Sequence, residues 1–270
     1  MSAPPTIIAD VIFNRTMKGI TRALSGDNND LCPCEAQTSR CFCQSFLSGP
    51  ARIMSEIDIT STSSMHIAGI DNVTNHMMCL VPIKSLDIRG SRNQVRLDPS
   101  ANLSDCAIMI RGSGNLIIVG KNTRLRGLIY VYGNKSLIRI GPETTTETVR
   151  FSVGGRASIT IGRDCMLSRN IEIRCFDEHP IYDLDTKEEI NNGQDVVLGD
   201  HVWIGEGVRV VKGTTIASGS IVGTGSLVSE SLTIPNAIYA GIPARMIKQR
   251  IAWAREPRLM NWEKVNFLSE

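Results

Sequence analysis

The chain has little that would direct it to a membrane, out of the cell or onto nucleic acid. No apolar stretch approaches the roughly 20 residues that a membrane-spanning helix needs. The N-terminus lacks the basic start, apolar centre and small-residue cleavage site of a signal peptide. A formal net charge of +2 gives no electrostatic reason to bind nucleic acid. We therefore expect a cytoplasmic protein without a transmembrane segment and without a nucleic-acid partner.

Cysteines are present, but not in the setting of a secreted, disulfide-bonded domain. Four of the eight form two C-x-C pairs, Cys32, Cys34, Cys41 and Cys43. Such thiolates could hold zinc in a tetrahedral site. However, C-x-C is less typical of zinc than C-x-x-C, so a loop with reduced thiols is the favoured interpretation. The others are scattered among aliphatic residues and are expected to be small buried side chains: Cys79, Cys106, Cys165 and Cys175.

A six-residue repeat dominates the second half of the 270-residue chain. Its aliphatic positions are Leu198, Ile204, Val210, Ile216, Val222, Val228 and Ile234, with glycine after several of them. This period matches neither a helix nor a simple alternating strand. It fits a chain that turns a corner after each short strand and points one aliphatic side chain inward. Three such faces make a coil of about 18 residues, so Leu198, Ile216 and Ile234 should stack along one edge.

Looser coils precede this segment. Glycine-led blocks begin at Gly90, Gly112, Gly133 and Gly154, spaced 22, 21 and 21 residues apart. The repeats predict a mainly β fold, a solenoid over residues 86–241 with an excursion at 174–195. Residues 1–85 would be an N-terminal extension, whose helical spacing near the start favours a cap on the solenoid. Residues 242–270 would be a short helix after Pro243 and a tail.

The stretch DVVLGDHVWIGEGVRVVKGTTIASGSIVGTGSLV, with DEHPIYD before it, resembles the hexapeptide-repeat acyltransferases. The similarity is close over residues 159–253, only rhythmic over 86–158 and absent over 1–85. It implies a left-handed parallel β-helix. Within the family, the excursion is most similar to the branch that O-acetylates cell-surface polysaccharides or their sugar precursors.

The excursion contains the residue type that acetyl transfer to a hydroxyl needs. The attacking hydroxyl must lose its proton, and histidine titrates near neutral pH. In the family a His-Pro at this point carries the general base, and the matching residues here are His179 and Pro180. Asp177, Glu178 or Asp183 could orient the His179 ring or stabilise its charged form.

Two other residues compete for a part in catalysis. His201, in GDHVWIG, is the rival base, although it could equally sit at a corner of the coil. Cys175 lies four residues before His179, and such a pair could form an acyl-enzyme. The resemblance implies instead a direct transfer with both substrates bound, which disfavours the cysteine.

The resemblance implies acetyl-CoA as the donor, with its pantetheine arm along the later coils. The matching positions are Trp203, Gly205, Gly223 and Thr224. Small residues there would let backbone groups approach the arm, and one N–H could stabilise the oxyanion. The glycines also have a structural explanation as corner residues.

Basic residues near the CoA phosphates have matches in Arg245 and Lys248, three apart on the predicted helix. Relatives often carry a lysine at the end of the last regular coil, where this chain has Ser229, Glu230 and Ser231. This difference argues against direct phosphate binding at that point.

The expected function is that of an acetyl-CoA-dependent O-acetyltransferase acting on a hydroxyl of a sugar or cell-surface polysaccharide. Because family members are trimers with active sites between neighbouring solenoids, we expect a homotrimer. Two alternatives stay open: a non-catalytic β-helix that serves as a scaffold or binding protein, and an acetyltransferase for serine or an amine.

Overall fold

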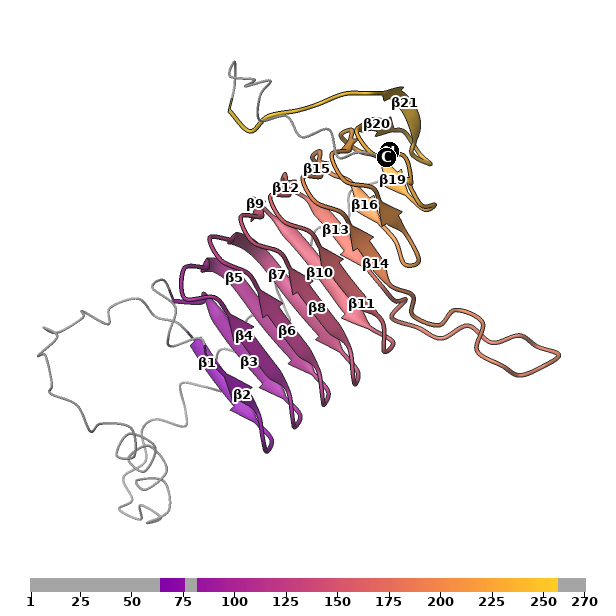
Figure 1. Cartoon of the computed structure of the whole chain (residues 1–270). Coiled ribbons are helices and arrows are strands. Elements are labelled where there is room, and N and C mark those ends of the chain that lie inside the picture. Colours follow the sequence, from indigo (N-terminus) through magenta and orange to yellow (C-terminus); the bar gives the residue numbers. More distant parts are fainter. Residues whose placement is uncertain (1–63, 76–81, 257–270) are drawn as a thin grey trace, which may run out of the picture. The chain divides into compact units, whose positions relative to one another are not determined.

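The computed structural model describes residues 64–75 and 82–256. In this part of the chain all the regular secondary structure is β-strand, and successive strands wind into stacked coils (Figure 1). The four-cysteine cluster, Cys79 and the N-terminal segment of helical spacing lie outside the described residues. None of the described residues belongs to a helix that could cross a membrane.

The coils have three faces, each a ladder of parallel strands. The first face contains β1 (Ser64–Ala68), β3 (Ser85–Arg89), β5 (Asn102–Arg111), β7 (Arg124–Tyr132), β10 (Val149–Gly154), β13 (Ile171–Arg174), β16 (Arg209–Val210) and β19 (Leu227–Val228). The second contains β2 (Val73–Thr74), β4 (Gln94–Leu97), β6 (Leu116–Val119), β8 (Leu137–Ile140), β11 (Ser158–Ile161), β14 (Val196–Leu198) and β17 (Thr215–Ile216). The third contains β9 (Thr145–Thr146), β12 (Met166–Leu167), β15 (Trp203–Ile204), β18 (Ile221–Val222) and β20 (Ala237–Ala240).

The long strands β5 and β7 run over the corner between the third and first faces, which therefore join into one sheet of 14 strands. Gly127 lies at this corner with φ +122°, and a Cβ on it would come within 2.1 Å of the Val149 carbonyl oxygen of the next coil. Only glycine allows both the backbone angle and the close stacking.

The inward aliphatic residues form one continuous core, as the repeat predicts. The six repeat positions from Leu198 to Val228 are all buried and pair in register with the coils before them. The prediction for Ile234 is wrong, because this side chain is 43% exposed. Leu232 takes its place beside Ile216, since the corner after Val228 is two residues shorter than a strict repeat of six would make it.

The ladder begins before the predicted boundary at Leu86, because β1 pairs with β3 from Ser64 to Ala68. At this end an asparagine ladder stabilises one corner. Asn93 donates from Nδ2 to the Gly112 carbonyl, and Asn115 repeats this bond one coil later to Gly133. These bonds satisfy polar groups that the stacking buries.

The predicted C-terminal helix after Pro243 is wrong. Residues Arg245–Gln249 form β21, an antiparallel strand on β20. Local helix propensity is weak compared with tertiary context. Here the edge of β20 offers unpaired backbone groups, and β21 covers that edge.

Candidate active site

The excursion leaves the solenoid between β13 and β14 and forms a two-legged arm that projects from the stacked coils (Figure 1). Tyr182 and Glu189 form an antiparallel bridge across the legs, and the Ile190 N–H donates to the Ile181 carbonyl at 2.9 Å. At the tip, Asp183 Oδ1 accepts the backbone N–H groups of two following residues. These bonds lower the pKa of Asp183, so its carboxylate is used to shape the turn.

His179 lies near the start of the arm with an exposed side chain. Its carbonyl accepts a bond of 2.9 Å from Asn191 Nδ2, across the arm. Within the described residues, no hydrogen bond or ion pair involves its ring. The ring is therefore open to solvent or to a second molecule, while its backbone is fixed.

The Asp177 carboxylate bonds to residues other than His179, so it does not orient the His179 ring in this structure. Its Oδ2 lies 2.7 Å from Lys212 Nζ and 3.0 Å from Asn191 Nδ2. The bond from Lys212 is the main cause that lowers the pKa of Asp177. Lys212 also donates to the Asn191 carbonyl at 2.6 Å, so these residues clamp the base of the arm to the solenoid. Sequence reasoning did not single out Asn191 or Lys212, since neither has a motif.

Cys175 is fully buried where the arm begins. Burial raises the pKa of its thiol to about 11. Its Sγ donates a long hydrogen bond of 3.5 Å to the Gly154 carbonyl inside the coil. A thiol of this kind is a poor nucleophile at neutral pH, which argues against an acyl-enzyme at Cys175.

His201 occupies a different corner, between the second and third faces, with φ +53°. Its Nδ1 lies 2.7 Å from Asp164 Oδ2 and its Nε2 lies 3.1 Å from the Trp253 carbonyl oxygen. The His201 ring also stacks on the Trp253 ring, with centroids 3.9 Å apart. Both ring nitrogens are thus engaged, and the role of a structural corner residue fits His201 better than that of a base.

A C-terminal strap, defined as residues 251–256, explains this environment. It runs back over the coils, and Trp253 Nε1 donates to the His201 carbonyl at 3.0 Å. Arg255 bonds to Asp164, the acceptor that also binds His201. The strap also reaches Trp203, whose ring lies 5.9 Å from that of Trp253.

Trp203 is half-buried on β15, and its Nε1 is a buried donor without a hydrogen-bond partner among the described residues. Gly205, Gly223 and Thr224 lie at the corner that follows this face. A Cβ on Gly205 would come within 2.7 Å of the Thr224 backbone nitrogen, so stacking alone accounts for this glycine. The residues expected to bind acetyl-CoA therefore share one edge of the solenoid. The Trp203 indole N–H at this edge has no partner among the described residues.

The two basic residues of the predicted helix lie on β21 instead. Arg245 makes a two-bonded pair with Glu230, at 3.0 and 2.9 Å. The glutamate that replaces the expected lysine thus neutralises Arg245. Lys248 is exposed opposite Ile238 of β20.

Comparison with curated proteins finds two relatives with the same enzyme activity. A polysialic acid O-acetyltransferase of Neisseria meningitidis is 32% identical over 189 residues, which are 70% of this chain and 88% of that protein. The chain belongs to the β-helix acyltransferase family. Another relative of the same name, from Escherichia coli O1:K1, is 37% identical over 51% of this chain and 44% of its own length. No protein-family model matches the chain.

Solved structures place this acetyltransferase in the polysaccharide O-acetyltransferase branch. A polysialic acid O-acetyltransferase aligns with a TM-score of 0.70 at 28% identity, over 77% of this chain and 98% of its own. A polysialic-acid-specific acetyltransferase aligns with a TM-score of 0.66 at 29% identity, over 73% and 91% of the two chains. These neighbours are left-handed β-helices, so the fold class implied by the sequence resemblance is confirmed.

Proposed function

We propose that this enzyme transfers an acetyl group from acetyl-CoA to a hydroxyl of an acidic polysaccharide, with His179 as the general base. The observation that carries the proposal is the exposed His179 ring on an arm whose backbone is clamped at its base. The two relatives are polysialic acid O-acetyltransferases, which supports a polymer with carboxylate groups as the acceptor.

In the proposed reaction, a ring nitrogen of His179 takes the proton of the acceptor hydroxyl. The hydroxyl oxygen then bonds to the thioester carbonyl carbon, and the carbonyl electron pair moves onto oxygen. When the carbonyl re-forms, the carbon–sulfur bond breaks and the CoA thiolate leaves with the proton that His179 held. The N–H groups of Gly205 and Gly223 already donate to the Val222 and Tyr239 carbonyls, so another backbone N–H of this edge would stabilise the oxyanion. Trp203 would shape the donor site.

A homotrimer is part of the proposal. The arm exposes large apolar side chains that the solenoid of its own chain does not cover: Ile181, Tyr182, Leu184 and Ile190. Exposed apolar groups together on one projecting element suit burial against another protein surface. A neighbouring copy would provide that surface and would bring its Trp203 edge to the His179 arm.

The test measures acetyl-CoA turnover as free thiol release with an acidic polysaccharide, a neutral polysaccharide, serine and an amine. His179→Ala should lower kcat by about 100- to 10,000-fold, the range for loss of a general base. His66→Ala is the matched control, because His66 is also an exposed histidine but lies on β1. Unchanged turnover in His179→Ala would exclude this base, and turnover only with serine or the amine would exclude the polysaccharide acceptor.

Mixed assemblies test the shared site. His179→Ala and Trp203→Ala chains would be denatured together, refolded and assayed. If each site uses His179 of one copy and Trp203 of its neighbour, some sites in the mixture regain both residues and activity reappears. Activity no higher than that of the separate variants would place both residues in one copy.

A further inference from the structure

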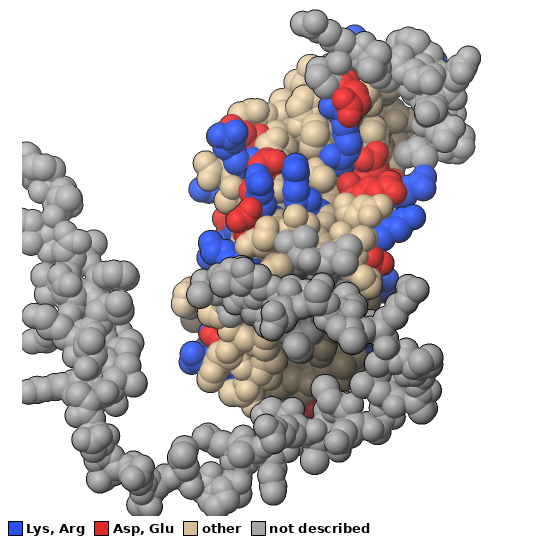
Figure 2. All heavy atoms as spheres, turned by 90° about the vertical axis from the view of Figure 1, so that its left-hand side faces the viewer, with Lys and Arg blue, Asp and Glu red and all other residues tan. Residues whose placement is uncertain are grey.

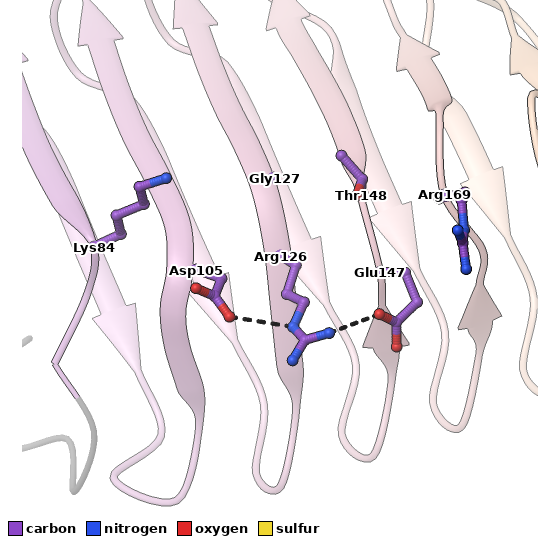
Figure 3. Close-up of a pocket in the computed structure, with 7 residues that line it drawn as sticks. All are labelled: Lys84, Asp105, Arg126, Gly127, Glu147, Thr148 and Arg169. Atoms are coloured by element: carbon purple, nitrogen blue, oxygen red, sulfur yellow. Dashed lines mark hydrogen bonds and ion pairs between the residues drawn. The ribbon is translucent and has the colours of Figure 1, made fainter.

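A charged groove lies upstream on the edge between the third and first faces, outside the candidate active site. It encloses a volume of about 540 Å³ and is lined by one charged side chain from each of five successive coils. These are Lys84, Asp105, Arg126, Glu147 and Arg169, spaced 21, 21, 21 and 22 residues apart. Figure 3 shows them in a row across the strands, with alternating charge.

The pairing within the row leaves its two ends available. Arg126 bridges both carboxylates, at 3.2 Å to Asp105 and 2.7 Å to Glu147. Lys84 has no ion pair with another described residue. Arg169 reaches its nearest carboxylate, Glu206, at only 3.9 Å and is 68% exposed. The acidic groups are therefore paired with Arg126, and Glu147 also with Arg124 at 3.3 Å from outside the row, while a cation at each end remains for an external anion.

An ion-pair ladder that only stabilises the stack would account for Arg126 but not for Lys84. Exposed pairs contribute little stability, about 0–1 kcal/mol each. The surface shown in Figure 2 likewise carries cations next to carboxylates rather than a patch of one sign. A groove of this kind offers cations to carboxylates and hydrogen-bond acceptors to hydroxyls, which is the chemistry of an acidic sugar polymer.

The groove is in line with the candidate donor edge. Met166 pairs with Trp203, and Leu167 with Ile204, so Arg169 stacks on the coil corner that begins at Gly205. The Gly207 N–H donates to the Arg169 carbonyl at 3.0 Å. Because coils lie about 4.8 Å apart, a polymer at the reaction centre needs only to follow this edge to enter the groove.

We propose that the groove between Lys84 and Arg169 is a second, non-catalytic binding site for the acidic polysaccharide. Carboxylates of the polymer pair with these two cations, while another segment of the same chain is acetylated. A regular array of charges suits a ligand that itself repeats. This inference rests on the proposed function for the identity of the polymer.

The experiment compares Lys84→Ala, Arg169→Ala and the double variant with Lys121→Ala and Arg139→Ala. The control residues are also exposed and cationic, but they lie outside the groove, Lys121 between β6 and β7 and Arg139 on β8 of the second face. Each variant is assayed with a long acidic polysaccharide and with its short oligomers. Thermal unfolding confirms that all the variants remain folded.

In the double variant, KM for the long polymer should rise about tenfold, the size expected for losing two exposed ion pairs. The kcat value and the KM for the short oligomers should not change, because an oligomer cannot span from the active site into the groove. The rise of KM with added salt should also become shallower, since fewer charge pairs are screened. Equal KM values for the polymer in wild type and double variant, or an equal loss in the control variants, would overturn the proposal.

Polymer binding without acetyl-CoA, measured on His179→Ala chains with and without the groove substitutions, separates the two proposals. If binding weakens with the groove substitutions, the groove is supported even when the wild type does not acetylate the polymer. If the wild type acetylates the polymer and binding is indifferent to Lys84 and Arg169, the groove is wrong and the proposed function stands. Absence of both binding and turnover overturns both.

Discussion

Replacing Arg255 with alanine should release the C-terminal strap from the solenoid. Arg255 Nε donates to Asp164 Oδ1 at 2.5 Å, and one Nη donates to Thr145 Oγ1 at 2.8 Å. The other Nη donates to the carbonyl groups of Cys165 and Glu143, at 2.7 and 3.3 Å. One side chain thus joins the strap to residues that lie 90 to 112 positions earlier.

The contribution of Arg255 to the free energy of strap attachment follows from these bonds. The charge-assisted bond to Asp164 contributes about 1.5–3 kcal/mol, and each bond to a neutral acceptor about 0.5–1.5 kcal/mol. The Arg255 side chain is 28% exposed, so water replaces part of what is lost. Ordering the arginine side chain also costs the wild type up to about 2 kcal/mol of rotamer entropy, a cost that alanine does not have. We expect Arg255→Ala to weaken strap attachment by about 2–4 kcal/mol.

Native-state hydrogen exchange of the Ile251 amide measures this attachment, because that N–H bonds to the Asn236 carbonyl at 2.9 Å. Its exchange should accelerate by about 30- to 1,000-fold in Arg255→Ala. Arg163→Ala is the control, since Arg163 makes an exposed pair with Asp200 and should change exchange by less than about fivefold. Exchange at Ile251 that is the same in both variants would refute the assigned role of Arg255.

Three further predictions concern the corner, the buried thiol and the arm. Gly127→Ala should lower the melting temperature well below that of Gly133→Ala, because both have positive φ but only Gly127 would place its Cβ 2.1 Å from a backbone oxygen; equal melting temperatures would contradict the stacking argument. Cys175, with a pKa of about 11, should resist alkylation at pH 8 in the folded protein, as followed by peptide mass spectrometry; rapid labelling would show that it is accessible. The lowered pKa of Asp177 means that its pairing with Lys212 contributes stability above the usual pKa of 3.8 and loses it as the pH falls below that value. Proteolysis of the arm should therefore increase on acidification below about pH 4 more in the wild type than in Asp177→Asn, in which only the turn held by Asp183 still weakens in acid; equal acid sensitivity would exclude the pair as its cause.

The repeat made most of the fold predictable, because each short strand needs only one inward aliphatic side chain and a tight corner. Val210 and Val222 are fully buried as the period of six requires. The same local rule failed at Ile234, where the last corner is shortened and Leu232 enters the core. A separate prediction, the helix after Pro243, failed at Arg245–Gln249, since a strand edge competes with helix propensity only once the coils are stacked.

In the candidate site, too, some features were predictable from the sequence and others were not. The break in the rhythm located the arm and His179, because residues that leave a regular repeat must lie outside its core. Asn191 and Lys212 fix that arm through side-chain contacts that no spacing encodes.

The sequence by itself therefore determined the solenoid, the position of the arm and the residue type suited to acid–base chemistry. Only the tertiary structure decided that Asp177 serves Lys212 rather than His179, and that His201 is engaged by Asp164 and the strap. It also decided that charges 21 or 22 residues apart line one groove. The physical reason is that these contacts depend on which coils lie next to each other, and that proximity exists only after the chain has folded.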